Sequence, residues 1–211
     1  MIISTKLLFI HIPKSAGSSI TAALNKELPG ASKGPFPYQH YTLQDYYNSI
    51  GSKTLDNLFI FGIIRNPWER MYSWYEFNKK QYHTMPHRFA NQPALKEKQF
   101  DVDFNEWLLT KQFIPIQEYK FTNCPIPAQK RSQFNWLFCK ERQPDYIGQV
   151  EKMDELIMEL IKNDLVKESF SIPHINVTNQ GKKYKSIYSK ESKEWIEHHF
   201  QKDIEYGQYT F

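Results

Sequence analysis

The chain has 211 residues, of which 40% are hydrophobic and 16% aromatic, which is enough for one domain with a substantial core and too short for two full ones. The net charge of +4 suits an anionic ligand, but the lysines are spread along the chain and lack the clustering typical of nucleic-acid-binding proteins. We therefore expect a single domain over residues 1–211 that does not bind nucleic acid.

Cysteine spacing and apolar runs indicate the compartment. Cys124 and Cys139 have no metal-ligand spacing and are expected to be free thiols. Polar residues interrupt the first apolar run, so no signal peptide is recognisable, and the longest apolar runs are shorter than a membrane span. We expect a cytoplasmic protein without a membrane span. The sequence carries no signal for an oligomeric state.

A strand, a loop and a helix start are predicted from Leu7 to Ile20. An apolar run ends at Pro13, and the loop that follows contains Lys14, Ser15, Ala16, Gly17, Ser18 and Ser19. Unpaired backbone N–H groups at the start of a helix bind phosphate or sulfate without a metal. The loop differs from the nucleotide-triphosphate motif, in which the lysine follows the second glycine, because Lys14 precedes Gly17. A serine-rich turn without any ligand is the alternative.

The next elements are read from apolar spacing and breakers. A helix is expected over 18–28, and the breaker-rich stretch 29–37 is expected to be irregular. It leads to His40 and to a short helix over 42–50 with Thr42 as its N-cap.

A second buried strand is expected over 58–64, and it ends at Arg65. Asn66 is suited to cap the following helix, whose buried stripe contains Trp68, Met71, Tyr72 and Tyr75. Ser73 lies off that stripe, on the face shared with Arg70 and Phe77. Two buried strands separated by helical sequence predict an α/β fold with three layers, a central parallel sheet flanked by helices.

The second half of the chain alternates between irregular and regular segments. Irregular stretches are expected over 81–101, 111–130 and 172–188, and a third strand over 145–150. Helices are expected around 104–108, 132–140, 153–161 and 190–204.

Ligands of open parallel sheets bind beyond the carboxyl ends of the strands. The loop after the first strand and Arg65 after the second should therefore lie at one edge of the sheet. Lys14 and the loop amides can hold one anionic group, and Arg65 with Ser73 can hold a second. The ligand implied is an anion with two separated negative groups.

These motifs resemble those of the sulfotransferases that use 3′-phosphoadenosine 5′-phosphosulfate (PAPS). Ile-Pro-Lys-Ser-Ala-Gly-Ser-Ser is similar to their 5′-phosphosulfate loop, and Arg-Asn-Pro-Trp-Glu-Arg-Met-Tyr-Ser, from Arg65 to Ser73, is similar to their 3′-phosphate motif. Weaker similarity covers most of the chain, at 40–43, 145–151, 172–176 and 203–207. The resemblance is greatest to the branch that includes the carbohydrate sulfotransferases and short bacterial members, and it implies their P-loop-like fold.

The resemblance implies a role for each matching residue. Lys14 would neutralise charge on the bridging oxygen as the sulfuryl group leaves. The amides and hydroxyls of the loop from Ser15 to Ser19 would hold the 5′-phosphate, and Arg65 with Ser73 the 3′-phosphate. A later basic segment, Lys182, Lys183 and Tyr184, would fold over the nucleotide as a corresponding loop does in relatives, or is a solvated turn. Arg131 and Gln133 are weaker candidates for contact with nucleotide or acceptor.

Attack by an acceptor hydroxyl requires a general base, and we assign it to His40. His11, within the first strand, is the second choice and is expected to orient the loop; a histidine that only packs is the alternative for His40. The predicted activity is transfer of a sulfuryl group from PAPS, without a metal, to a hydroxyl or amine of a small-molecule or carbohydrate acceptor, leaving 3′-phosphoadenosine 5′-phosphate (PAP). The alternatives are a nucleotide kinase-like phosphotransferase and a non-catalytic nucleotide-binding protein.

Overall fold

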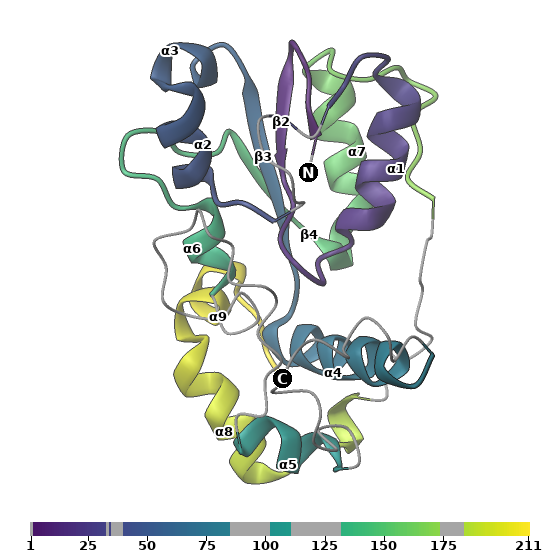
Figure 1. Ribbon diagram of the computed structural model, residues 1–211, viewed down its shortest axis with the longest axis vertical. Helices are drawn as coiled ribbons and strands as arrows, with labels where there is room; N and C mark the ends of the chain where they lie inside the picture. The colour runs from purple at the N-terminus through teal and green to yellow at the C-terminus, as the bar shows by residue number, and fades with distance from the viewer. Residues whose placement is uncertain (1, 33, 35–39, 85–101, 111–131, 174–183) are drawn as a thin grey trace. The chain divides into compact units, whose positions relative to one another are not determined.

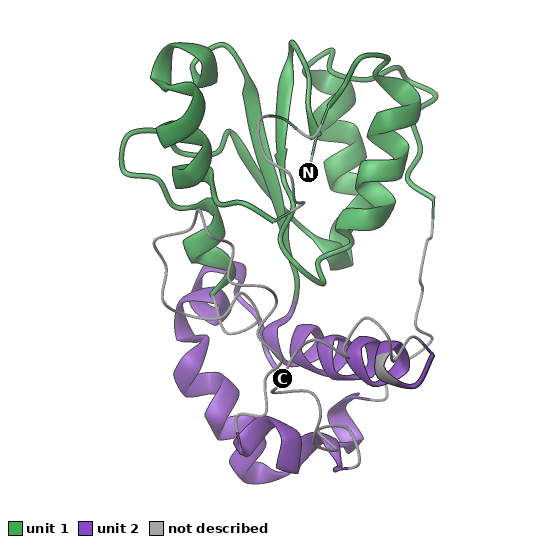
Figure 2. Cartoon of the chain, viewed as in Figure 1, with its two compact units in different colours: residues 1–65, 120–123, 131–177 green, residues 66–119, 124–130, 178–211 purple. Residues whose placement is uncertain are grey.

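A computed structural model of the protein describes residues 2–32, 34, 40–84, 102–110, 132–173 and 184–211. The chain forms two compact units (Figure 2). Unit 1 is built from residues 1–65, 120–123 and 131–177, and unit 2 from residues 66–119, 124–130 and 178–211. The expectation of a single domain over 1–211 stays a prediction.

Unit 1 contains a four-stranded sheet in the order β1-β2-β3-β4. Its strands are β1 (Ile2–Ile3), β2 (Leu7–Ile10), β3 (Phe59–Ile64) and β4 (Tyr146–Gln149). The pairs β2–β3 and β3–β4 are parallel, so Ile10 pairs with Gly62 and Ile64 with Gln149 near their carboxyl ends. The two parallel strand pairs, with helices connecting their strands, confirm the predicted α/β architecture.

Helices cover both faces of this sheet, as Figure 1 shows. On one face lie α1 (Gly17–Glu27) and α7 (Met153–Lys162), which follows a 3-10 turn, η3 (Val150–Lys152). On the other lie α2 (Leu43–Ile50), α3 (Ser52–Leu55) and α6 (Gln133–Leu137). The arrangement gives the three layers that the sequence predicts.

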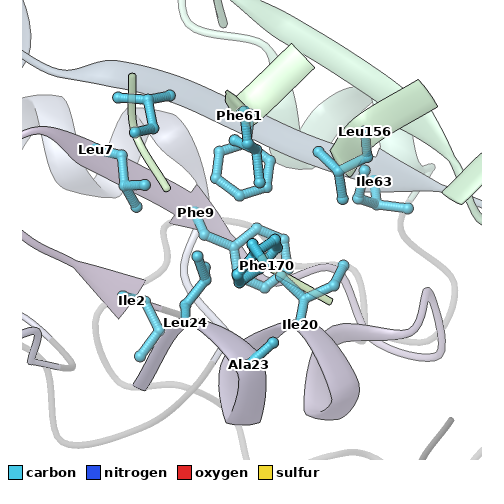
Figure 3. Close-up of a cluster of buried hydrophobic side chains, with 12 residues drawn as sticks. Ile2, Leu7, Phe9, Ile20, Ala23, Leu24, Phe61, Ile63, Leu156 and Phe170 are labelled. Carbon is cyan, nitrogen blue, oxygen red and sulfur yellow. The ribbon is translucent and has the colours of Figure 1, made fainter. Parts of the chain in front are cut away.

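The core of unit 1 follows from the period of two along the strands. Phe9 and Phe61 point to the α1 and α7 face, where their rings stack with centroids 5.0 Å apart. Figure 3 shows these rings with Leu24 of α1 and Leu156 of α7, all almost fully buried. The packing fixes the start of α1 relative to the carboxyl end of β2, and hence the loop between them.

Unit 2 is helical and has an aromatic core. Its elements are α4 (Pro67–Thr84), α5 (Phe104–Leu109), the 3-10 turn η4 (Tyr184–Ser186), α8 (Lys190–His199) and α9 (Gln201–Gly207). The core cluster includes Trp68, Met71, Tyr72 and Tyr75, the stripe predicted for α4. Asn66 Oδ1 accepts from the N–H groups of Trp68 and Glu69 at 3.1 and 3.3 Å, which confirms the predicted cap.

Several boundaries differ from the sequence predictions. The residues before Leu7 form an additional strand, β1, which pairs antiparallel with β2. Ser4 closes the tight turn between the two strands: its N–H donates to the carbonyl of Leu7, and its Oγ accepts from the N–H of Leu7. A short helix, α3, follows α2, and α4 continues to Thr84 beyond the predicted irregular start at 81. The last predicted helix is interrupted at Phe200, which is buried with φ −122° and ψ 26°.

Candidate active site

The loop from Pro13 to Ser19 has an unusual backbone. Lys14 and Ala16 have positive φ angles of 67° and 56°, a region that costs energy for residues other than glycine. Ser15 lies between them and is 1% exposed. Consecutive residues in such alternating conformations turn their N–H groups toward one side and form a concave anion-binding nest.

The start of α1 supplies donors to this nest. The carbonyl of Ala16 accepts from the N–H groups of Ser19 and Ile20, at 3.0 and 3.2 Å. Within the described part of the chain, no hydrogen bond occupies the N–H groups of Ala16, Gly17 or Ser18. These donors lie at the positive end of the helix dipole, so the loop can hold a phosphate or sulfate group, as predicted from its sequence.

The side chain of His11 leaves no room for a Cβ at position 17. A Cβ built on Gly17 would lie 1.8 Å from Cδ2 and 1.9 Å from Nε2 of His11, well inside van der Waals contact. The imidazole of His11 therefore packs directly on the first turn of α1. His11 lies just after the end of β2, although the sequence analysis placed it within that strand, and it is 4% exposed. Its role in orienting the loop stays a prediction.

Arg65 reaches this loop from the next strand. Its Nη1 donates to the carbonyl oxygen of Lys14 at 3.2 Å. The carboxyl ends of β2 and β3 thus bring the two predicted cationic features to the same edge of the sheet. The sequence predicted the shared edge, because parallel neighbours end on the same side, but not this hydrogen bond.

Electrostatics at this edge favour an anion. Burial, and then the charge of Arg65, lower the pKa of Lys14 from 10.5 to about 8. Burial, and then the neighbouring His40, lower the pKa of His11 well below its usual value, so His11 is neutral at neutral pH. A bound anion would relieve the repulsion between the two cationic side chains, Lys14 and Arg65.

His40 lies beside the loop with a defined ring orientation. Its Nδ1 lies 3.0 Å from the carbonyl oxygen of His11. Because a carbonyl only accepts, Nδ1 carries the proton and Nε2 is the basic nitrogen of the neutral ring. The ring also packs edge-on against Trp136 of α6, with centroids 6.2 Å apart.

The chain at His40 is held by the start of α2. Thr42 caps this helix in a complete capping box, with its Oγ1 accepting from the N–H of Asp45 at 3.1 Å and its N–H donating to Asp45 Oδ2 at 2.8 Å. Thr42 was predicted as the N-cap of this helix, and His40 lies two residues before it. Tyr41 between them is fully buried.

Ser15 and Gln133 have partners that the sequence did not indicate. The Oγ of Ser15 donates to Oε1 of Gln133 at 3.0 Å, so this hydroxyl bonds to the protein instead of facing a ligand. Gln133 also holds the backbone of Arg65, through Arg65 N to Oε1 at 2.8 Å and Nε2 to Arg65 O at 2.7 Å. A glutamine at the start of a five-residue helix gives no sequence signal for such a role.

The remaining predicted residues belong to unit 2 or lie outside the described residues. Ser73 belongs to α4 in unit 2, where it is 9% exposed and Arg70 1% exposed, so the buried arc of α4 is wider than the predicted stripe. Its cooperation with Arg65 stays a prediction. The ring of Tyr184 is 5% exposed in the aromatic core of unit 2, whereas Lys182, Lys183, Arg131 and Cys124 lie outside the described residues.

Among the described residues, no group of three or more His, Cys, Asp or Glu side chains could hold a metal ion. No described helix has the length and apolar character needed to cross a membrane.

The fold is that of an α/β protein, with cationic residues at the carboxyl ends of β2 and β3 beside the N–H groups at the start of α1. A family model of the sulfotransferases matches residues 3–210, nearly the whole chain. The chain therefore belongs to the sulfotransferase family, and is an enzyme that uses PAPS. No curated protein and no solved structure matches it significantly. Family membership confirms the resemblance and leaves the kinase-like alternative without support.

Proposed function

We propose that the enzyme transfers the sulfuryl group of PAPS to a hydroxyl or amine group of a small-molecule or carbohydrate acceptor, without a metal, with His40 as general base. The contact between Arg65 Nη1 and the Lys14 carbonyl carries the proposal, because it joins two cationic residues beside one anion-binding loop. PAPS has negative groups at both its 5′ and 3′ ends, and this chemistry fits two adjacent anion sites.

The loop would hold the 5′ end of the nucleotide. The N–H groups of Ala16, Gly17 and Ser18 are the donors available there, and the hydroxyls of Ser18 and Ser19 are assigned to the same group. The hydroxyl of Ser15 is assigned instead to Gln133, as its hydrogen bond indicates. Arg65, with Ser73 as its predicted partner, would hold the 3′-phosphate and so distinguish PAPS from nucleotides that lack this group.

In the proposed step, the acceptor oxygen or nitrogen forms a bond to sulfur while sulfur loses its bond to the bridging oxygen of the 5′-phosphate. The proton of the acceptor moves to Nε2 of His40, whose Nδ1 proton is held by the His11 carbonyl at 3.0 Å. Lys14 stabilises the negative charge that develops on the bridging oxygen. PAP leaves with the electron pair of the broken bond.

His40 is favoured over His11 as base on two observations. His40 is half-buried, whereas His11 is 4% exposed and its ring is packed against Gly17. An acceptor could therefore reach the ring of His40 more readily.

The nucleotide specificity can be tested without knowing the acceptor. Thermal unfolding is measured with PAP, with 5′-AMP and with Mg-ATP. PAP at about a hundred times its dissociation constant should stabilise the protein by roughly 2.7 kcal/mol. A shift with Mg-ATP but none with PAP would refute the proposal.

Turnover separates an enzyme from a binding protein. PAPS is incubated with the protein and pools of hydroxyl-bearing and amine-bearing acceptors, and PAP release and acceptor mass are followed. A gain of one sulfuryl group by an acceptor supports the proposal. The non-catalytic alternative would be favoured by tight PAP binding without transfer to any hydroxyl or amine acceptor. In that case a His40 variant would also release PAP from PAPS at the same rate as the unaltered protein.

A further inference from the structure

Helix α6 is seated tightly on the sheet near the candidate site. A Cβ built on Gly62 of β3 would lie 2.3 Å from Cδ2 of Leu137, so the side chain of Leu137 occupies the space that a larger residue at position 62 would need. Gln133 and Trp136 of the same helix are both fully buried. The short helix therefore presents Gln133 from a fixed position.

The amide of Gln133 joins two segments that are distant in sequence. Its Oε1 accepts from Ser15 Oγ at 3.0 Å and from Arg65 N at 2.8 Å, and its Nε2 donates to Arg65 O at 2.7 Å. An amide oxygen has two lone pairs, and both are used here. A reversed amide would lose both bonds to the backbone of Arg65, so the network fixes the orientation of the side chain.

Each end of this bridge belongs to one anion-binding feature. Ser15 is the residue between Lys14 and Ala16, whose positive φ angles shape the loop. Gln133 binds both the backbone N–H and the backbone C=O of Arg65, and this fixes the position from which the Arg65 side chain extends. The distance between the loop and Arg65 thus depends on one buried side chain as well as on the Arg65 to Lys14 contact.

We propose that Gln133 is a positioning residue that fixes the spacing between the loop and Arg65, and thereby favours nucleoside 3′,5′-bisphosphates over monophosphates. The inference rests on the proposed function, because it assumes that the loop and Arg65 bind the two ends of one nucleotide. A ligand with two anionic groups gains from a fixed spacing, since the second group then binds as an intramolecular event. A ligand with one group gains nothing from it.

The test compares three nucleotides by calorimetric titration: PAP, 5′-AMP and 3′-AMP. Gln133→Met keeps the approximate side-chain volume and removes all three hydrogen bonds. We expect PAP affinity to fall by about tenfold or more, while the affinities for 5′-AMP and 3′-AMP change by less than about threefold. In turnover, the KM for PAPS should rise more than kcat falls.

A second variant covers the case in which Gln133→Met does not fold. Ser15→Ala removes only the bond from Ser15 Oγ to Gln133 and leaves the two bonds to Arg65 intact. We expect the same direction with a smaller effect, a loss of about two- to fivefold in the preference for PAP. Gln201→Met, on the exposed surface of α9, is the matched control and should change none of the affinities.

The outcomes separate this inference from the proposed function. If the unaltered protein shows no preference for PAP, the proposed function fails and the inference fails with it. If the unaltered protein prefers PAP and Ser15→Ala and any folded Gln133→Met keep that preference, the inference alone is overturned. An equal loss for all three nucleotides would make Gln133 a residue of general stability and would also overturn it.

Discussion

The imidazole of His11 occupies the space that a side chain at position 17 would need: a Cβ on Gly17 would lie 1.8 Å from Cδ2 of His11. The same residue, His11, accepts a hydrogen bond from Nδ1 of His40 through its carbonyl oxygen at 3.0 Å. One residue therefore contacts both the anion-binding loop and the proposed base. A change at Gly17 should disturb both.

Gly17→Ala forces the His11 ring or the loop to move. Overpacking of this kind costs typically about 1 to 3 kcal/mol, so we expect a lower free energy of unfolding and weaker PAP binding. Denaturant unfolding and PAP titration measure the two effects. Asn25→Ala, at an exposed position of the same helix, is the control and should change neither by much. A fully active and stable Gly17→Ala protein would contradict the packing seen here.

Lys14→Met should stabilise the ligand-free protein. The pKa of Lys14 falls from 10.5 to about 8 on folding, so the folded state binds fewer protons than the unfolded state between these values. The contribution of Lys14 to stability should therefore rise from about pH 8 to pH 10.5, because the charge that folding disfavours is lost first from the folded state. Below pH 8 the unfavourable charge is fully present. The methionine variant removes it and should gain on the order of 1 kcal/mol there, after allowance for screening by water.

The measurement is urea unfolding at several pH values. The Lys14→Met protein should lack the rise in stability above pH 8 and should bind PAP at least about tenfold more weakly, since a charge-assisted contact is lost. Lys26→Met, on the exposed end of α1, is the matched control. Equal pH profiles for the unaltered protein and Lys14→Met would show that Lys14 is not desolvated.

The main features of unit 1 could be predicted because each has a local cause. The apolar runs at 7–10 and 59–64 give adjacent parallel strands, and strand order then brings Arg65 to the carbonyl of Lys14. Thr42 could be recognised as a cap because the acidic residue three positions later completes a capping box.

Other features depend on contacts between distant residues and give no local signal. Gln133 is separated from Ser15 by 118 positions, and only the folded sheet brings them together. The interruption of the last helix at Phe200 has no glycine or proline to announce it and follows the burial of the Phe200 ring in the core of unit 2. The positive φ angles of Lys14 and Ala16 are likewise set by the loop as a whole.

His40→Asn tests the base with its geometry retained. The asparagine amide can still donate to the His11 carbonyl from the position of Nδ1, but it has no group at the position of Nε2. We expect transfer to fall by about 10²- to 10⁴-fold while PAP affinity stays within about threefold. His198→Asn, exposed on α8, serves as the control. Unchanged turnover in His40→Asn would remove His40 from the mechanism and direct attention to another base.

Arg65→Ala tests whether the second cationic feature binds the 3′ end of the nucleotide. Loss of charge-assisted hydrogen bonds typically costs about 1.5 to 3 kcal/mol each, so affinity for PAP and 3′-AMP should fall by about tenfold or more.

Affinity for 5′-AMP should change less, because the loop donors are untouched. Since the charge of Arg65 is the second cause of the lowered pKa of Lys14, the variant should also shift the pH-dependent rise in stability to higher pH. Ser73→Ala should weaken 3′-AMP in the same sense if the two residues share the 3′-phosphate. A larger loss for 5′-AMP than for 3′-AMP in Arg65→Ala would reverse the assignment of the two ends of the nucleotide.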